Sequence, residues 1–166
     1  MAQKMEVKMK EIKAPKPLEF SSDNEVIFLA GSIEMGAAEN WQTRIIQELK
    51  NKDVIILNPR RDDWDSSWEQ KIDNPNFREQ VEWELDAMSE ANLIAMYFDP
   101  NTKSPITLLE LGLFHEKTPY RELIVYCPEG YWRKGNVDIV CRRFHITNCI
   151  SWNDFILTIK RKIGNL

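Results

Sequence analysis

The hydrophobic positions of the chain fall into short uninterrupted runs that alternate with segments in which apolar residues recur at helical spacing. The runs are bounded by charged residues, glycine or proline, which is typical of strands buried on both faces of a sheet. Four such strands are predicted, with a fifth, shorter one near the C-terminus, at residues 25–31, 53–59, 92–99, 122–128 and 144–147.

Between these runs, apolar residues recur every three or four positions, which places them on one side of a helix. Ser104, followed by Pro105, has the residue types preferred at the N-cap and first position of a helix. Residues 129–140 are predicted as loop with a short helix. The predicted helices, with two apolar stripes, are 37–52 (Trp41, Ile45, Leu49), 77–91 (Val81, Leu85, Met88), 104–117 and 151–163.

The alternation of buried strands and helices predicts the fold class. It favours an α/β protein with a single doubly wound, flavodoxin- or Rossmann-like domain and a mostly parallel five-stranded sheet. Ligands of such sheets bind at the carboxyl ends of the strands. The segments to inspect are therefore those that follow the strands, at residues 30–36, 58–68, 98–110 and 128–138.

Length and composition fit one globular domain. The chain has 166 residues, of which 43% are hydrophobic, and a formal net charge of −4. The acidic balance argues against a nucleic acid polymer as partner, and no apolar run approaches the roughly 18 residues of a membrane span. The N-terminus lacks the apolar core of a secretory signal, so a cytoplasmic location is expected. Residues 1–24, Lys-rich and polar, are predicted as an N-terminal arm, and residues 25–166 as the domain.

Several common functional motifs are missing from the chain. Its three cysteines, Cys127, Cys141 and Cys149, have neither the number nor the spacing of a disulfide framework or a zinc site. A GxGxxG fingerprint, a P-loop and a serine nucleophile elbow are also lacking. His115 and His145 are therefore interpreted as ordinary core or surface histidines. No metal or other cofactor is expected.

Two glutamates stand out because of their surroundings. Glu110 lies in a helix that is apolar on nearly every side, and a buried carboxylate is costly unless it is paired or used in chemistry. The alternatives for Glu110 are a solvent channel or a basic partner. Glu84 lies within one turn of the apolar stripe of its helix, whereas the other acidic residues of that helix are expected to face solvent.

Two loops have residue types suited to ligand binding. Gly31 and Ser32 follow the first predicted strand, where a glycine lets the backbone approach a ligand and helix amides favour an anion. The loop after the second strand contains Arg60, Arg61 and Trp64, which suit phosphate binding and base stacking. A tight strand–helix turn in the first case, and a surface loop whose tryptophans pack onto the body in the second, are the simpler alternatives.

With these residues in view, the chain resembles the nucleoside 2-deoxyribosyltransferase superfamily, and in particular its deoxyribosyltransferase-like branch, which is related to the 2′-deoxynucleoside 5′-phosphate N-hydrolases. The resemblance covers about residues 25–140. It is carried by three pieces in this order, which are Phe28-Leu29-Ala30-Gly31-Ser32-Ile33, Glu84-Leu85 with Ala91-Asn92, and Leu109-Glu110-Leu111-Gly112.

The resemblance implies displacement at the anomeric carbon of a nucleoside or nucleoside monophosphate, with no cofactor. By position, Glu110 matches the family's nucleophilic glutamate, and Glu84 matches an aspartate that handles the base proton. Ser104 matches a serine that contacts the 5′-phosphate in the N-hydrolases. Gly31 and Ser32 match the loop on the sugar or phosphate side.

The resemblance also implies a homodimer or larger homo-oligomer. Asn136 falls where the family lends a residue across the interface into the neighbouring site. Phe28 stands where the family often has a tyrosine near the nucleophile, and the turn before Glu110 lacks the family's glycines. The loop with Arg60, Arg61 and Trp64 is peculiar to this branch, and together with Ser104 it favours a phosphorylated substrate.

Three functions remain open from the sequence. The first is an N-glycosidic enzyme that transfers or hydrolyses a (deoxy)ribosyl group. The second is a non-catalytic nucleotide-sensing module with the same fold, which has no need for a nucleophilic Glu110. The third, a flavodoxin-like or response-regulator-like domain that binds a protein partner, lacks the acidic cluster expected after the first strand.

Overall fold

A computed structural model describes residues 9–34, 38–116 and 120–164. Within them the chain forms one six-stranded sheet in which every neighbouring pair of strands is parallel. The strand order is β1-β3-β2-β4-β5-β6. The strands are β1 (Lys10–Lys13), β2 (Val26–Gly31), β3 (Ile55–Asn58), β4 (Leu93–Tyr97), β5 (Glu122–Tyr126) and β6 (Thr147–Cys149).

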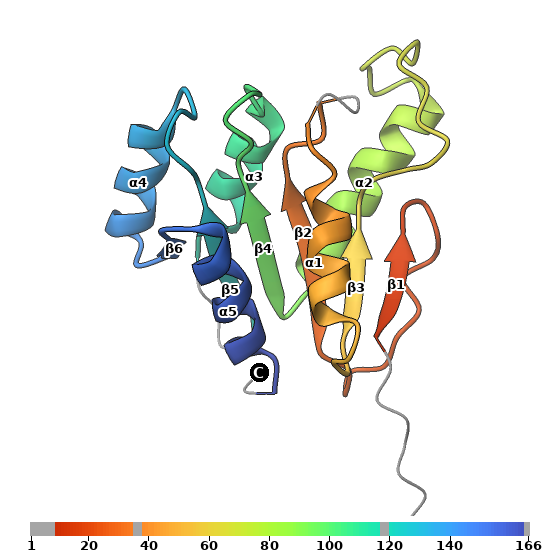
Figure 1. The fold of residues 1–166 in the computed structure, drawn as a ribbon. Coiled ribbons are helices and arrows are strands. Elements are labelled where there is room, and N and C mark those ends of the chain that lie inside the picture. Colours follow the sequence, from red (N-terminus) through yellow and green to blue (C-terminus); the bar gives the residue numbers. More distant parts are fainter. Residues whose placement is uncertain (1–8, 35–37, 117–119, 165–166) are drawn as a thin grey trace, which may run out of the picture.

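Helices cover both faces of the sheet (Figure 1). α1 and α5 pack on one face, where Trp41, Ile45 and Phe155 meet residues of β2, β3 and β4 in one apolar cluster. α2, α3 and α4 pack on the other face, in a cluster that contains Trp83 and Leu111. The helices are α1 (Trp41–Leu49), α2 (Pro75–Glu90), α3 (Pro105–Phe114), α4 (Lys134–Arg143) and α5 (Trp152–Lys162). The predicted α/β, doubly wound fold is confirmed.

The sheet has one strand more than the five predicted. β1 lies within the segment 1–24 that was interpreted as an arm, and it pairs with β3 over four residues. Its sequence is KEIK, in which only Ile12 is buried. An edge strand with one face to solvent tolerates charged side chains, so it has no apolar run to detect.

Two further elements near the C-terminus differ from their predictions. Residues 134–143 form a three-turn helix, α4, where loop with a short helix was predicted over 129–140. The last strand is β6 at 147–149 and not 144–147, because α4 extends to Arg143 and the chain turns through His145 at φ 55° before it enters the sheet.

The topology indicates at which end of the strands a ligand would bind. β2 continues into α1 on one face, whereas its neighbour β4 continues into α3 on the other face. The connections therefore diverge between the carboxyl ends of β2 and β4, which is where open α/β sheets bind ligands. In Figure 1 this edge is at the top, where the strand arrows point. In the described ranges, no helix is long and apolar enough to cross a membrane.

Candidate active site

Glu110 lies in the second turn of α3 and is only 7% exposed. Its neighbours on the helix, Leu109 and Leu111, point in different directions, since Leu111 enters the core and Leu109 is exposed. Among the residues that the structure describes, none donates a hydrogen bond to Glu110 or forms an ion pair with it. The carboxylate therefore meets neither of the alternatives that would make it structural, a basic partner or an open solvent position.

Glu84 lies on α2 and faces the same region. Its side chain is partly buried, and Gln80, one turn earlier, donates a hydrogen bond of 2.6 Å from Nε2 to Glu84 Oε1. The same Nε2 donates to the Pro59 carbonyl oxygen at 2.8 Å. Gln80 thus connects the carboxylate of Glu84 to the first residue after β3.

The orientation of α2 differs from the predicted one. Val81 and Leu85, expected in a buried stripe, are 37% and 38% exposed, and Gln80, Trp83 and Ala87 are buried in their place. The helix is turned because the large Trp83 packs against Phe28 and its indole donates to the Lys16 carbonyl. This rotation brings Gln80 and Glu84 to the margin of the core.

The two carboxyl groups influence each other electrostatically. Burial raises the pKa of Glu110 well above its usual range, and the negative charge of Glu84 raises it further. Burial raises the pKa of Glu84 to about 7, against the hydrogen bond from Gln80, which favours the ionised form. Two acids that share one low-dielectric site do not both ionise easily, so the charge of one makes the second proton harder to remove.

Three buried hydroxyl groups meet at the carboxyl ends of β2 and β4. Ser32 and Ser104 are in mutual hydrogen-bond contact, and Thr102 Oγ1 lies 3.1 Å from Ser32 Oγ and 2.7 Å from Ser104 Oγ. The backbone N–H of Asp99 also donates to Ser32 Oγ, at 2.9 Å. Ser32 and Ser104, predicted separately as site residues, are thus brought together from loops 72 residues apart, with Thr102 as a third member.

Ser104 occupies the N-cap position of α3, as predicted, but does not act as a side-chain cap. Its backbone is left-handed, at φ 46°, and its hydroxyl turns to Ser32 and Thr102. The carboxylate of Glu34, from the loop after β2, accepts a hydrogen bond from the Ser104 N–H in its place. A carboxylate at this end of α3 is favoured by the positive end of the helix dipole.

Gly31 is required by the packing of the strand ends. Its φ of +147° is a conformation that other residues rarely adopt, and a Cβ atom there would lie 2.3 Å from the Tyr97 carbonyl oxygen. The indole of Trp41 would be 2.9 Å away. Glycine therefore allows β2 to end close against β4, which places Ser32 at the crevice.

Comparison with known families agrees with this geometry. Residues 24–131 match the family described as nucleoside 2-deoxyribosyltransferase like. The chain belongs to this family. The match covers β2 to β5 and includes both glutamates and the hydroxyl cluster. A search of curated proteins found no match.

In this member of the nucleoside 2-deoxyribosyltransferase-like family, the two arginines of the loop after β3 have different surroundings. Arg61 has a side chain only 4% exposed and is neutralised by Asp63 and Glu79, each at 2.9 Å. Arg60 is half-buried, and its guanidinium has only neutral acceptors, all at 3.4 Å, among them Gln42 Oε1. Within the described ranges no carboxylate pairs with Arg60, and burial lowers its pKa. Arg61 braces the loop, whereas Arg60 has no counter-ion in the part of the chain that the structure describes.

Trp64 packs within the loop after β3. Its ring lies 5.1 Å from that of Trp68 in an edge-on arrangement, and the Arg61 guanidinium lies 5.1 Å from the Trp68 ring. The buried indole N–H of Trp64 has no hydrogen-bond partner in the described part of the chain. The loop is therefore internally packed, and nothing in it contacts the hydroxyl cluster directly.

Phe28 and Asn136 lie apart from the carboxylates. Phe28 is 1% exposed in the middle of β2 and packs against Trp83, so it serves the core beneath the site. Asn136 is exposed near the start of α4 and makes no side-chain contact with Glu84 or Glu110. A role for Asn136 in the family's shared site would require a second subunit.

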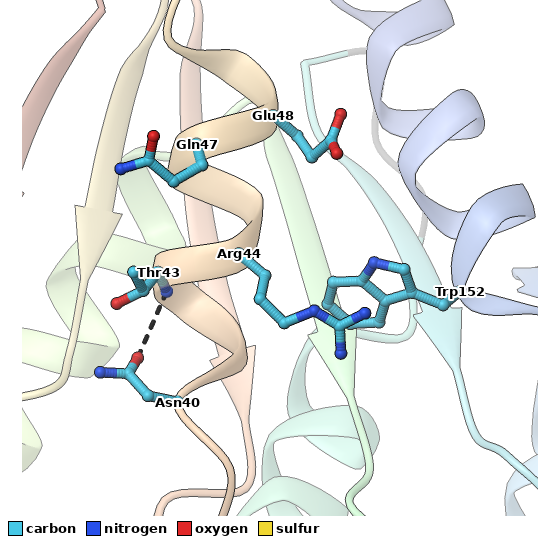
Figure 2. Close-up of a pocket in the computed structure, with 6 residues that line it drawn as sticks. All are labelled: Asn40, Thr43, Arg44, Gln47, Glu48 and Trp152. Atoms are coloured by element: carbon cyan, nitrogen blue, oxygen red, sulfur yellow. Dashed lines mark hydrogen bonds between the residues drawn. The ribbon is translucent and has the colours of Figure 1, made fainter.

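A shallow surface hollow lies between α1 and α5, and it is separate from this site (Figure 2). Arg44 lies over the Trp152 ring there at 4.0 Å, and Glu48 pairs with Lys160. The hollow shares no residue with the carboxylate pair or the hydroxyl cluster. Its lining residues are Asn40, Thr43, Arg44, Gln47, Glu48 and Trp152. We place the candidate active site at the strand ends, because the two buried and electrostatically interacting acids, Glu84 and Glu110, lie there.

Two site residues had no sequence signal strong enough to find them. Gln80 resembles any polar residue of a helix, and only the rotation of α2 by Trp83 shows that it is buried beside Glu84. Thr102 lies two residues before Ser104 in a segment already marked as following a strand. The only hint of Thr102 in the sequence is weak: hydroxyl residues follow two predicted strands, and these strands turn out to be neighbours in the sheet.

Proposed function

We propose that the chain is an N-glycosidic bond enzyme that acts on nucleosides or nucleoside 5′-monophosphates. The reaction is transfer or hydrolysis of the (deoxy)ribosyl group through a covalent intermediate on Glu110. The observation that supports this proposal best is the pair of buried acids, Glu110 and Glu84, with which no cation of the described residues forms an ion pair. A carboxylate so costly to bury is retained where chemistry uses it.

In the first half-reaction, an oxygen of the ionised Glu110 attacks C1′ of the sugar. The bond from C1′ to the base nitrogen breaks, and its electron pair stays with the base, which takes the proton held by Glu84. The transition state has oxocarbenium character, which the negative charge of Glu110 stabilises. The products are a glycosyl ester of Glu110 and a neutral base.

In the second half-reaction, a ring nitrogen of another base or the oxygen of water attacks C1′. The ester bond to Glu110 breaks and restores its carboxylate, and the proton lost by the attacking group returns to Glu84. Covalent catalysis of this kind divides one difficult displacement into two easier ones. Neither step requires a cofactor.

The proposal is tested by incubating the protein with a panel of nucleosides, deoxynucleosides and their 5′-monophosphates, with and without an acceptor base. Chromatography then measures free base and new nucleoside. Free base without acceptor indicates hydrolysis, and a new nucleoside that forms only with acceptor indicates transfer. Absence of both products across the panel would contradict the enzymatic function and leave the sensing module.

Arg60 is expected to bind a substrate phosphate. An ionised hydrogen-bond partner contributes roughly 1.5–3 kcal/mol, so Arg60→Ala should weaken binding of a nucleoside 5′-monophosphate about 10- to 150-fold. The unphosphorylated nucleoside should bind Arg60→Ala almost as well as the wild type. Calorimetric titration of both ligands measures this difference.

Arg61→Ala is the matched comparison. Because Arg61 is engaged by Asp63 and Glu79, its loss should loosen the loop and weaken nucleoside and nucleotide by similar factors. Equal weakening of the two ligands in Arg60→Ala as well would remove the phosphate assignment and give both arginines a structural role.

We also propose that the protein is a homodimer, as its family resemblance implies. α3 presents Ile106, Leu109 and Leu113 on its outer side, each more than half exposed, next to the buried Glu110. A second copy that covers this face would bring its own residues, Asn136 among them, toward the site. Leu109→Glu should raise the dissociation constant of the dimer at least about tenfold, which corresponds to 1.4 kcal/mol. Sedimentation velocity measures it, and a monomeric wild type at micromolar concentration would contradict the proposal.

A further inference from the structure

One polar atom beside the candidate acid has no partner. Gln80 is 5% exposed, and within the described residues its side-chain carbonyl oxygen, Oε1, accepts no hydrogen bond. A buried carbonyl without a donor is rare in native proteins and calls for an explanation. This oxygen belongs to the same amide group whose nitrogen donates the hydrogen bond to Glu84.

The orientation of the Gln80 amide follows from its partners. The Pro59 carbonyl can only accept a hydrogen bond, so the atom 2.8 Å from it must be the amide nitrogen, Nε2. The second hydrogen of Nε2 points to Glu84 Oε1. The two hydrogens are thus both used, and Oε1 is held in the remaining direction without an alternative orientation.

Gln80 and Glu84 are joined by one hydrogen bond, so the unpartnered amide oxygen of Gln80 and the carboxyl group of Glu84 lie close to each other. Glu84 accepts from Gln80 through Oε1, and its other oxygen is a donor in the protonated form that the proposed reaction requires. Gln80 Oε1 is an acceptor only. The complementary edge of a ligand has an acceptor next to a donor.

We propose that Gln80 selects nucleobases that have an amino group beside the ring nitrogen that Glu84 protonates. Adenine offers this pattern at N7 and its 6-amino group, and cytosine offers it at N3 and its 4-amino group. Hypoxanthine and uracil have a carbonyl oxygen at the corresponding position, which faces Gln80 Oε1 without a hydrogen between them. This inference rests on the proposed function, because it takes Glu84 as the group that meets the base.

The hydrogen bond from Gln80 to the Pro59 carbonyl fixes the side chain at the start of the loop after β3. Oε1 is shielded from solvent in this structure, so a base reaches it only when the side chains above it move. The loop that starts at Pro59 is hydrogen-bonded to Gln80. The same amide nitrogen holds Glu84, so Gln80 fixes the position of the carboxyl group relative to this loop.

The experiment compares ligands that differ in this amino or oxo group and in the neighbouring ring nitrogen. The adenine and hypoxanthine pair is the more direct test, because N7 is an acceptor in both, whereas N3 changes from an acceptor in cytosine to an N–H donor in uracil. Pairs of 2′-deoxyadenosine with 2′-deoxyinosine and 2′-deoxycytidine with 2′-deoxyuridine, and the same pairs as 5′-monophosphates, are titrated into the Glu110→Gln variant by calorimetry. Binding to this variant requires no turnover. The amino member of at least one pair should bind roughly 10- to 100-fold more tightly than the oxo member, since the oxo group leaves a buried acceptor unpaired.

The decisive variant is Gln80→Leu in the same background. It should reduce the preference for the amino base to within about threefold, whatever its common effect on both ligands. Gln42→Leu is the matched control, because Gln42 is also a fully buried glutamine with an unpartnered amide atom, but it lies on α1 and contacts Arg60 rather than Glu84. It should leave the preference intact.

The outcomes separate this inference from the proposed function. An amino preference that is lost in Gln80→Leu supports the inference even if the wild type releases no base, in which case the protein is a sensor with the same specificity. Base release by the wild type without an amino preference, or with a preference that Gln80→Leu leaves unchanged, overturns the inference and preserves the enzyme. Failure of every pair to bind overturns both.

Discussion

Glu110→Gln will abolish base release while the protein stays folded. The variant keeps the shape of the side chain and removes the oxygen nucleophile, so the step that forms the glycosyl ester is lost. For a nucleophile that acts as a unit with its partners, the loss in kcat amounts to roughly four to six orders of magnitude. The rate of free base formation, followed by chromatography over hours, measures it.

One further measurement and one control variant accompany this prediction. Mass spectrometry of the wild type with a slow substrate should find a sugar adduct on the peptide that contains Glu110. Glu82→Gln is the control, because Glu82 is an exposed acid on α2 with a weak contact to Arg78, and it should retain wild-type turnover. Near-normal turnover in Glu110→Gln would contradict the covalent mechanism.

Glu84→Gln will slow the reaction in a way that depends on the leaving group. A general acid contributes typically 10²- to 10⁴-fold, so bases that must be protonated to leave should lose about that factor in kcat. A nitrophenyl glycoside, whose leaving group departs as a stable anion, should lose less than about tenfold. A uniform loss for both kinds of substrate would assign Glu84 to orienting the sugar.

The same variant should be more stable than the wild type at alkaline pH. The folded-state pKa of Glu84 is raised from 4.5 to about 7, so the stability of the wild type is intact below pH 4.5 and declines as the pH rises through 7. Glutamine does not ionise and avoids this cost. At pH 8 the gain should be about 3 kcal/mol, or about 6–12 °C in Tm. It should vanish at pH 4, which calorimetry at both values can check.

The rate of the reaction should also depend on pH, because the protonation of each acid affects the other. The reaction needs one proton on the pair, held by Glu84 while Glu110 is ionised. The larger upward pKa shift of Glu110 favours the opposite placement in the free protein, so the bound substrate has to favour ionised Glu110. When the pH falls, both acids are protonated and Glu110 cannot act as the nucleophile. When the pH rises, both acids are ionised and Glu84 has no proton to give to the base. We therefore expect a bell-shaped dependence of kcat/KM on pH, as is usual for a coupled acid–base pair.

Much of the fold could be read from local pattern. The four long strands are continuous apolar runs because both faces of a central parallel strand are buried, and α1 shows its buried face through Trp41, Ile45 and Leu49. The burial of Glu110 was predictable in the same way, because a helix that is apolar on nearly all sides packs against the core and takes its carboxylate with it. The sequence determined these features because burial is repeated over many residues of one element.

Other features were decided only by tertiary contacts. β1 exists because β3 offers an edge to pair with, and its own sequence is mostly charged. The rotation of α2 depends on where the single large side chain Trp83 finds space against Phe28. Local spacing had indicated Val81 and Leu85 as the buried face, and the indole outweighed them.

The site itself shows the same division. The residue types that carry charge and hydroxyl groups were visible along the chain, whereas their pairing was not. Arg60 and Arg61 are chemically identical neighbours, and only the positions of Asp63 and Glu79 show that one is neutralised and the other is not. Which side chains meet across a sheet edge depends on distances between loops that are far apart in sequence. The sequence by itself determined which groups are present, and the tertiary structure decided which of them act together.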